Sequence, residues 1–188
     1  MLILAFTLLI VVSMFSYLSG LQKNALAIQA DNFLQAISVV LNADRDLYQA
    51  KLASTMHLSK QGDSAALEAE VEDNAQQVKQ RFADYLQFLK NYPDVQQQFA
   101  EFGKDYQLWY QSVKALLEAS KAGNAGADLI AEEQTQFAAL RNVLDKAGEA
   151  ALNKSVSEQQ VLTSEISFFQ NTTYTITAII LLLSLIHI

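Results

Sequence analysis

The chain has 188 residues, of which 51% are apolar and 18% are charged, and its formal net charge is −7. It has no cysteine, which excludes a disulfide framework, a thiolate zinc site and a cysteine nucleophile, and its negative charge argues against a nucleic-acid partner. One proline and six glycines are too few for the turns of a β-sandwich or barrel, so an all-α fold is favoured. All 13 basic and 20 acidic side chains lie between Lys23 and Glu165, which leaves both ends of the chain uncharged.

The first predicted element is a transmembrane helix over residues 1–18, MLILAFTLLIVVSMFSYL. As a helix, these residues reach about 27 Å, close to the ~30 Å hydrocarbon core of a bilayer. A cleaved signal peptide is the alternative, because Ala25-Leu26-Ala27 is a small-x-small site. The absence of a basic n-region and the position of Lys23 before that site favour the membrane helix. Because the apolar run starts at once, we expect a short cytoplasmic leader to be missing.

Residues 19–173 predict a periplasmic four-helix bundle. Helix formers dominate, and breaks occur only near residues 59–64, 91–94 and 123–128. Short loops make sequential helices antiparallel, so an up-down-up-down bundle returns both apolar ends to the same membrane. The first and fourth helices are then expected to be continuous with transmembrane helices. The predicted helices span about 1–60, 64–91, 94–122 and 127–188.

Each predicted helix carries an apolar stripe at spacings of three and four residues, which is typical of a bundle core. Charged residues interrupt two of the stripes, Asp44 in the first helix and Glu133 in the fourth. The stripes of the first and second helices are Phe33, Ile37, Val40, Asp44 and Leu47, and Leu67, Val71, Asn74, Val78, Phe82, Tyr85 and Leu89. Those of the third and fourth are Val95, Phe99, Phe102, Tyr106, Trp109, Val113 and Leu116, and Leu129, Phe137, Leu140, Leu144, Ala147 and Ala151.

The last predicted element is a second transmembrane helix over residues 174–188, YTITAIILLLSLIHI, which is truncated. Its final six residues, 183–188, match the translation of a common transposon-end sequencing adaptor. We therefore expect this tail to be an assembly artefact and the protein to continue, which the nucleotide record would test. Without flanking residues, the positive-inside rule gives no orientation.

The sequence predicts no catalytic, metal or cofactor site. The two histidines, His57 and His187, cannot form an HxxxH-type metal site, and neither a Gly-rich phosphate loop nor a nucleophile elbow occurs. The carboxylates between residues 68 and 73 are spaced as a solvated helix face. We therefore expect neither an enzyme nor a bound cofactor, and we interpret His57 as a surface or partly buried side chain.

A dense polar group in the first bundle helix, at residues 42–49, is the candidate ligand site. Asp44 takes a core position, where a carboxylate is costly unless it is paired or hydrogen-bonded. In the structural interpretation, Asp44 pairs with Arg81 or Arg141 and sets the helix register. In the functional interpretation, the group lines a polar gap between helices or subunits, where arginine binds a carboxylate and aspartate an amine. The residues alone leave both open.

A second candidate is the aromatic set Tyr106, Trp109 and Tyr110 in the third helix. The first two lie on the apolar stripe and are expected in the core, whereas Tyr110 lies beside it and is more available to a ligand. The full set of candidate ligand-binding residues is Asp44, Arg45, Tyr48, Gln49, Arg81, Tyr110 and Arg141.

The chain resembles the ligand-binding region of bacterial methyl-accepting chemotaxis proteins of the four-helix-bundle type. The likeness rests on a bundle between two membrane helices and on LNADRDLYQA at residues 41–50. It also rests on Asn74-x-x-Gln77-Val78-x-x-Arg81-Phe82, followed by the helix with Trp109. It covers essentially the whole chain up to the tail.

The resemblance implies an inner-membrane homodimer whose first and fourth helices lie nearest the dimer axis. It implies a small-molecule ligand or a periplasmic binding protein as partner, and a displacement of the fourth helix that reaches a cytoplasmic kinase and its adaptor. The residues for that output are missing from this chain. The alternatives are the same input module on a membrane histidine kinase or diguanylate cyclase, or a periplasmic interaction bundle that senses nothing.

Overall fold

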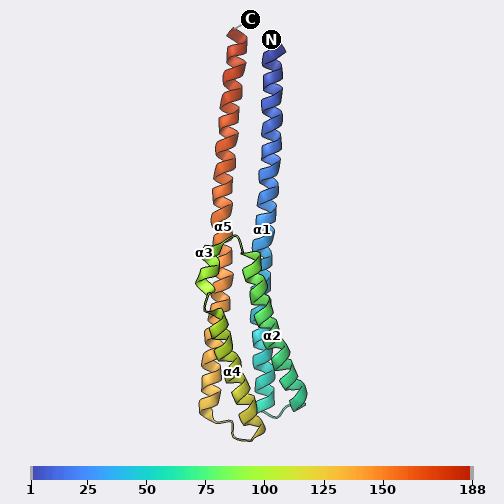
Figure 1. Ribbon diagram of the computed structural model, residues 1–188, viewed down its shortest axis with the longest axis vertical. Helices are drawn as coiled ribbons and strands as arrows, with labels where there is room; N and C mark the ends of the chain where they lie inside the picture. Colours follow the sequence, from blue (N-terminus) through green and yellow to red (C-terminus); the bar gives the residue numbers. More distant parts are fainter. Residues whose placement is uncertain (1, 187–188) are drawn as a thin grey trace. The chain divides into compact units, whose positions relative to one another are not determined.

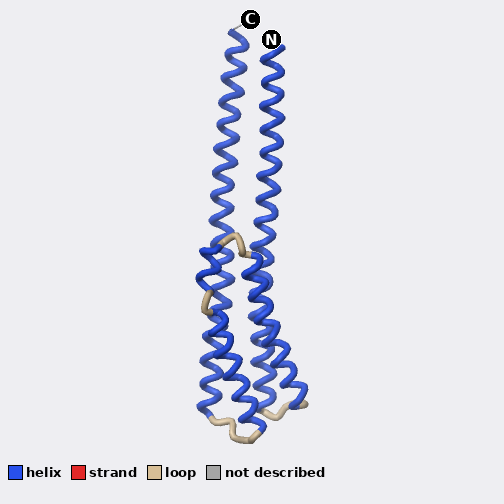
Figure 2. Tube along the Cα trace, in the orientation of Figure 1, coloured by secondary structure: helices blue, strands red, loops and turns tan. Residues whose placement is uncertain are grey.

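The computed structural model of the protein describes residues 2–186, with side chains described at residue 6 and from 9 to 183. Every regular element in that range is helical, which confirms the predicted all-α fold class. Figures 1 and 2 show the helices along the chain. They are α1 (Leu2–Leu58), α2 (Ser64–Phe88), α3 (Pro93–Gln96), the 3₁₀ helix η1 (Gln97–Phe99), α4 (Phe102–Lys121) and α5 (Ala127–Ile186).

The chain divides into two compact units, and the larger one, residues 32–154, is the four-helix bundle. In this unit the chain runs along α1, back along α2, forward again through α3, η1 and α4, and back along α5, as Figure 1 shows. This alternation confirms the predicted antiparallel bundle. Contacts between helices hold it together, such as the buried hydrogen bond from the Tyr85 hydroxyl to the Ala147 carbonyl oxygen (2.9 Å).

The smaller unit combines residues 1–31 of the chain with residues 155–188. Within it the two helical stretches lie side by side, with the rings of Phe15 and Phe169 stacked at 5.3 Å and Gln29 Nε2 donating to Glu158 Oε2 (3.2 Å). Among the described residues, one helical stretch, Ala127–Leu183, is long and apolar enough to cross a membrane. Two predicted segments lie partly outside the described residues. In the first predicted membrane helix, side chains 1–5, 7 and 8 are not described, and in the predicted artefact tail neither His187 and Ile188 nor side chains 184–186 are described.

The core of the bundle follows the predicted stripes closely in α2 and in the third helix, but not in α1. Phe33, Val40 and Leu47 of α1 are buried as predicted, yet Ile37 and Asp44 are only partly buried. The inward positions expected for Ile37 and Asp44 are taken by the alanines one residue earlier, Ala36 and Ala43. The buried alanines of α1 are Ala36, Ala43, Ala50 and Ala53. Asp44 is therefore not a core residue, because the neighbouring Ala43 takes the inward position.

The third bundle helix is interrupted, which corrects the prediction of one helix over 94–122. It starts at Pro93 as expected, but it narrows to a 3₁₀ turn at residues 97–99 and α4 begins only at Phe102. Phe99 and Phe102 both pack against the Phe82 ring, at 6.1 and 3.5 Å between centroids. A 3₁₀ turn has three residues per turn, so it brings residues three apart to the same side. The interruption therefore accommodates this aromatic cluster.

Candidate functional site

Polar and aromatic side chains of α1 and α5 meet on one face of the bundle, and this face is the candidate site. It contains three of the seven predicted ligand-binding residues, together with three residues from the same two helices. The set, called the α1–α5 cluster below, is Asp44, Tyr48, Lys51, Glu133, Phe137 and Arg141.

An ion pair between Asp44 and Arg141 forms one half of the α1–α5 cluster. Asp44 Oδ1 and Arg141 Nε lie 3.4 Å apart, but they are not aligned as a hydrogen bond. Burial raises the pKa of the Asp44 carboxyl, and the nearby charge of Arg141 only partly offsets this. The guanidinium also lies over the ring of Tyr48, 5.0 Å from its centroid. The pair is thus held in place without being fully hydrogen-bonded.

A buried ion pair between Lys51 and Glu133 forms the other half of the α1–α5 cluster. The Glu133 side chain is completely buried, and Lys51 Nζ donates to its Oε2. The ammonium of Lys51 also lies 5.7 Å from the centroid of the Phe137 ring, which meets Tyr48 edge-on at 5.2 Å. The two aromatic rings therefore join the two ion pairs into one cluster.

Unpaired polar atoms distinguish this face from the rest of the bundle. Among the described residues, four buried side-chain nitrogen or oxygen atoms have no hydrogen-bond partner, and three of them belong to the cluster: Asp44 Oδ1, Glu133 Oε1 and Arg141 Nε. Buried polar atoms in native proteins are nearly always satisfied. Two acceptors and one donor of the cluster therefore have unused hydrogen-bonding capacity.

Asp46 takes the buried carboxylate position that the sequence assigned to Asp44. Its side chain is completely buried, and it accepts hydrogen bonds from Arg81 Nε and from Arg45 Nη2, the latter at 2.9 Å. Of the two partners predicted for Asp44, only Arg141 is therefore realised, and Arg81 serves a different aspartate. Arg45 and Gln49 are exposed on α1.

Tyr110 lies away from the cluster, between α4 and α2. Its hydroxyl donates to Glu72 Oε2, and its ring stacks on Tyr106 at 5.9 Å. Burial and the Glu72 carboxylate raise the pKa of Tyr110 to about 12, while the hydrogen bond from Tyr110 lowers the pKa of Glu72. The structure thus brings neither Tyr110 nor Arg81 to the α1–α5 face.

Sequence reasoning missed Lys51, Glu133 and Phe137 as members of the site. Glu133 carried a usable signal, because a carboxylate interrupting an apolar stripe demands a partner just as Asp44 did. Phe137 was assigned to the core and is only partly buried. Lys51 gave no signal, because a lysine beside alanines and leucines of a helix is ordinary.

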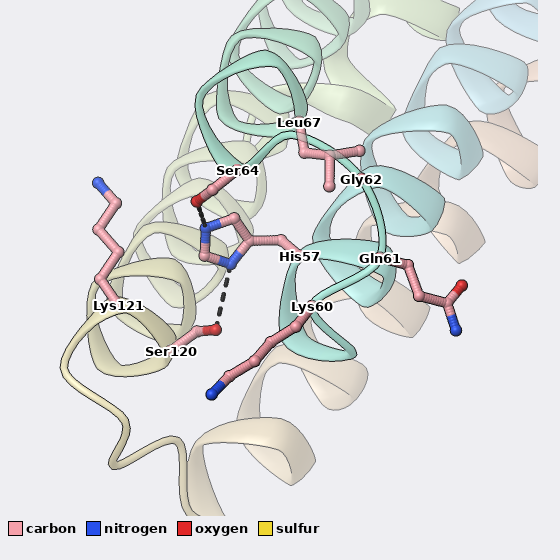
Figure 3. A pocket seen from close by; sticks show the side chains of 8 residues that line it. All are labelled: His57, Lys60, Gln61, Gly62, Ser64, Leu67, Ser120 and Lys121. Carbon is pink, nitrogen blue, oxygen red and sulfur yellow. Dashed lines mark hydrogen bonds between the residues drawn. The ribbon is translucent and has the colours of Figure 1, made fainter.

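His57, expected at the surface or partly buried, is buried near the end of α1 and contacts side chains of α2 and α4. Its Nε2 lies within hydrogen-bonding distance of Ser64 Oγ (2.7 Å) and Glu68 Oε1 (3.1 Å) of α2, and its Nδ1 within that distance of Ser120 Oγ (3.1 Å) of α4. Figure 3 shows His57 with Ser64 and Ser120 beside a cavity of about 230 Å³. Among the described residues, no group of three or more acidic or histidine side chains could hold a metal ion. We therefore interpret His57 as a structural residue that links α1 to α2 and α4.

Comparison with known proteins identifies the family. A family model described as "Tar ligand binding domain homologue" matches residues 1–155. Comparison with curated proteins and with solved structures gave no match. The matched family consists of ligand-binding sensor domains of chemoreceptors and is not an enzyme family. The match spans most of the chain, including all of α1 to α4 and the part of α5 that carries the α1–α5 cluster, so the protein belongs to the family of Tar ligand-binding domain homologues.

Proposed function

We propose that this chain is the extracytoplasmic sensing and transmembrane signalling module of a bacterial chemoreceptor, with its bundle in the periplasm and its apolar ends in the inner membrane. Family membership supports the sensing role. The smaller unit supports the anchoring, because it exposes large apolar side chains that lipid would cover. Among them are Phe6, Leu9, Met14, Phe168, Ile179 and Leu182.

The unpaired polar atoms of the α1–α5 cluster are the observation that supports ligand sensing at this face. A carboxylate on the ligand would complete the hydrogen bonding of Arg141, and an ammonium group would complete that of Asp44 and Glu133. The ligand class that fits is therefore a small molecule carrying a carboxylate, an amine or both. Binding between α1 and α5 would also act directly on the two helices that carry the apolar ends.

Isothermal titration calorimetry on the full chain in lipid nanodiscs, with a panel of L-amino acids and dicarboxylates, tests this site. We expect Asp44→Asn and Arg141→Gln each to weaken the binding of a ligand from the panel by about tenfold or more, since a charge-assisted hydrogen bond contributes roughly 1.5–3 kcal/mol. Lys146→Ala is the matched control, because Lys146 is exposed on the same helix. Unchanged affinity in both site variants would place the ligand elsewhere.

An exposed apolar stripe on α1 supports a homodimer. Leu34, Leu41 and Leu52 are 66%, 63% and 60% exposed, and with Tyr48 they repeat at spacings of seven, seven and four residues. Such a stripe on one face of a helix is the pattern of a helix–helix seam. A second copy offers the same stripe, so two α1 helices can cover each other about a two-fold axis. Arg45 and Gln49 lie on the same helix and would border that seam.

Single-cysteine crosslinking tests the dimer cleanly, because the chain has no cysteine of its own. We expect Leu41→Cys to form an intersubunit disulfide under mild oxidation, since residues on a two-fold seam approach within the Cα distance that a disulfide needs. Leu108→Cys is the matched control, an exposed leucine on α4. Equal crosslinking of the two variants, or none from Leu41→Cys, would argue against this seam.

We propose that ligand binding displaces α5 and so reaches a cytoplasmic kinase and its adaptor through residues beyond this chain. Gln29 and Glu158 are a suitable probe, because their side chains are hydrogen-bonded across the smaller unit. In the double variant Gln29→Cys/Glu158→Cys, the rate of disulfide formation should change when a bound ligand is added. An identical rate with and without ligand would contradict a displacement at this level.

A further inference from the structure

A groove lined by aromatic rings lies between α2 and the interrupted third helix, on a part of the bundle that the α1–α5 cluster does not use. It has a volume of about 530 Å³, within the range of sites that hold small molecules. Phe82 comes from α2, Phe99 from η1, and Phe102 and Tyr106 from α4. The 3₁₀ turn that breaks the third helix thus supplies one wall of the groove.

The one charged side chain that lines this groove is positive. Lys79 lines it and is exposed, and it makes no ion pair among the described residues. The amides of Gln96 and Gln107 also line it, and Gln96 is already committed through a hydrogen bond from its Nε2 to the Leu86 carbonyl oxygen (2.7 Å). No acidic side chain is among the lining residues. The groove therefore has aromatic side chains along its wall and one lysine, Lys79, at its edge.

We propose that this groove binds a small aromatic carboxylate, with the ring against the phenylalanine and tyrosine rings and the carboxylate at Lys79. Charge complementarity with Lys79 favours the carboxylate, and ring stacking favours the aromatic part. The four rings are between 0% and 8% exposed, so a flat protein surface does not reach them, and the groove has the volume for a single planar ring. The site lies within one subunit and is independent of the α1 seam.

Gly103 provides a variant that blocks the groove without unfolding the bundle. It lines the groove, and a Cβ atom added there meets no atom within 4 Å. A leucine at this position would occupy the groove, and it would favour the helix more than glycine does. Gly103→Leu should therefore keep or raise the melting temperature while it removes the space for a ring.

The test uses the full chain in lipid nanodiscs, with benzoate as the probe and titration of empty nanodiscs subtracted. Binding is followed by calorimetry and by the fluorescence of Trp109, the only tryptophan, whose ring lies 5.9 Å from that of Tyr106. We expect benzoate to bind, benzyl alcohol to bind more weakly and acetate not to bind. Lack of benzoate binding at millimolar concentration, or equal binding of benzyl alcohol, would overturn the proposal.

The variants then assign the binding to the groove. Gly103→Leu should weaken benzoate by at least about tenfold, because a filled groove cannot hold a ring. Lys79→Ala should weaken benzoate by about threefold to fivefold, the size of an exposed ion pair, and leave benzyl alcohol unchanged. Lys146→Ala is the control for general loss of positive charge and should bind benzoate like the parent chain. Loss of benzoate binding in Arg141→Gln would place the probe at the α1–α5 cluster and overturn the assignment to the groove.

Two further results with these variants would overturn the assignment. Benzoate affinity that survives Gly103→Leu would place the binding elsewhere. A smaller oligomer of Gly103→Leu in analytical ultracentrifugation would show that a second copy covers the groove instead. Either result leaves the sensing role of the α1–α5 cluster untouched, because that role is tested by separate variants.

Discussion

Replacing Lys51 with methionine should destabilise the bundle strongly, because it leaves the Glu133 carboxylate buried without a counterion. Glu133 is 0% exposed, its Oε1 has no hydrogen-bond partner, and Lys51 is the only cation paired with its Oε2 among the described residues. Removing one partner of a buried pair costs about 3–5 kcal/mol. Because the Lys51 side chain is 23% exposed and water can enter there, we expect the lower end, about 3 kcal/mol.

The assay is thermal unfolding of the full chain in lipid nanodiscs, followed by the fluorescence of Trp109, which is completely buried in the bundle. A loss of about 3 kcal/mol corresponds to a melting temperature lower by about 10 °C for a chain of this size. The double variant Lys51→Met/Glu133→Met removes both charges and fills the same space. It should melt within a few degrees of the parent chain or above it, because a buried pair contributes little net stability over apolar residues.

Comparing the single and double variants shows whether the loss of stability comes from the buried Glu133 carboxylate. If Lys51→Met melts less than about 3 °C below the parent chain, the loss is under roughly 1 kcal/mol and Glu133 is not an uncompensated buried charge. If the double variant is as unstable as Lys51→Met alone, the loss comes from the packing of the Lys51 stem and not from the carboxylate. Glu133→Gln alone should be milder than Lys51→Met, because the amide stays neutral when buried.

Three further variants test local features of the bundle. Tyr110→Phe removes the hydrogen bond that lowers the pKa of Glu72. A lowered carboxyl pKa stabilises the fold at pH values above the ordinary pKa of 4.5, and this stabilisation is lost as the pH falls through the lowered pKa. The variant should therefore melt at a lower temperature than the parent chain at pH 7, and the difference should disappear as the pH falls below about 4.5. Lys60→Gly should raise the melting temperature by a few degrees, because Lys60 has φ +56° and a left-handed residue other than glycine costs roughly 1–2 kcal/mol. Gly123→Ala should lower the melting temperature, because Gly123 has φ +71° and an alanine is strained in that conformation. Equal melting temperatures of Lys60→Gly, Gly123→Ala and the parent chain would contradict these backbone conformations.

The fold was predictable because apolar periodicity and helix breakers carry most of the information about a helical bundle. Every stripe residue predicted for α2 is buried, and so is every one predicted for the third helix. The 3₁₀ turn at residues 97–99 was not predictable, because aromatic residues three apart suit both an α-helix and a 3₁₀ turn. In α1 the stripe was assigned to large side chains, so the inward-facing alanines were overlooked.

The C-cap of α1 shows a similar limit at a single turn. Within the predicted break at residues 59–64, Gly62 is the residue type that favours a left-handed cap. In the structure both Lys60 (φ +56°) and Gly62 (φ +93°) have a positive φ, and the helix closes at Lys60: its N–H donates to the His57 carbonyl oxygen (3.1 Å) and the Gln61 N–H to the Met56 carbonyl oxygen (2.9 Å). His57 lies in the last turn of α1 and is held by side chains of α2 and α4. Tertiary contacts of the last turn thus decide where the helix stops.

The pairing of the charged residues depends on interhelical register, which no single helix encodes. Asp44 and Asp46 lie two residues apart on α1 and so face directions about 200° apart, each toward a different neighbouring helix. From sequence, Arg81 and Arg141 were both candidate partners of Asp44, since each could reach α1 from a neighbouring helix. The structure assigns Arg81 to Asp46 and Arg141 to Asp44. The first pair leaves its carboxylate fully buried and hydrogen-bonded, whereas the second leaves polar atoms unpaired, so the two pairs differ in what they can do. The Asp46 pair can set register, and of the two pairs only the Asp44 pair has hydrogen-bonding capacity left, which is why the proposed ligand site is placed there.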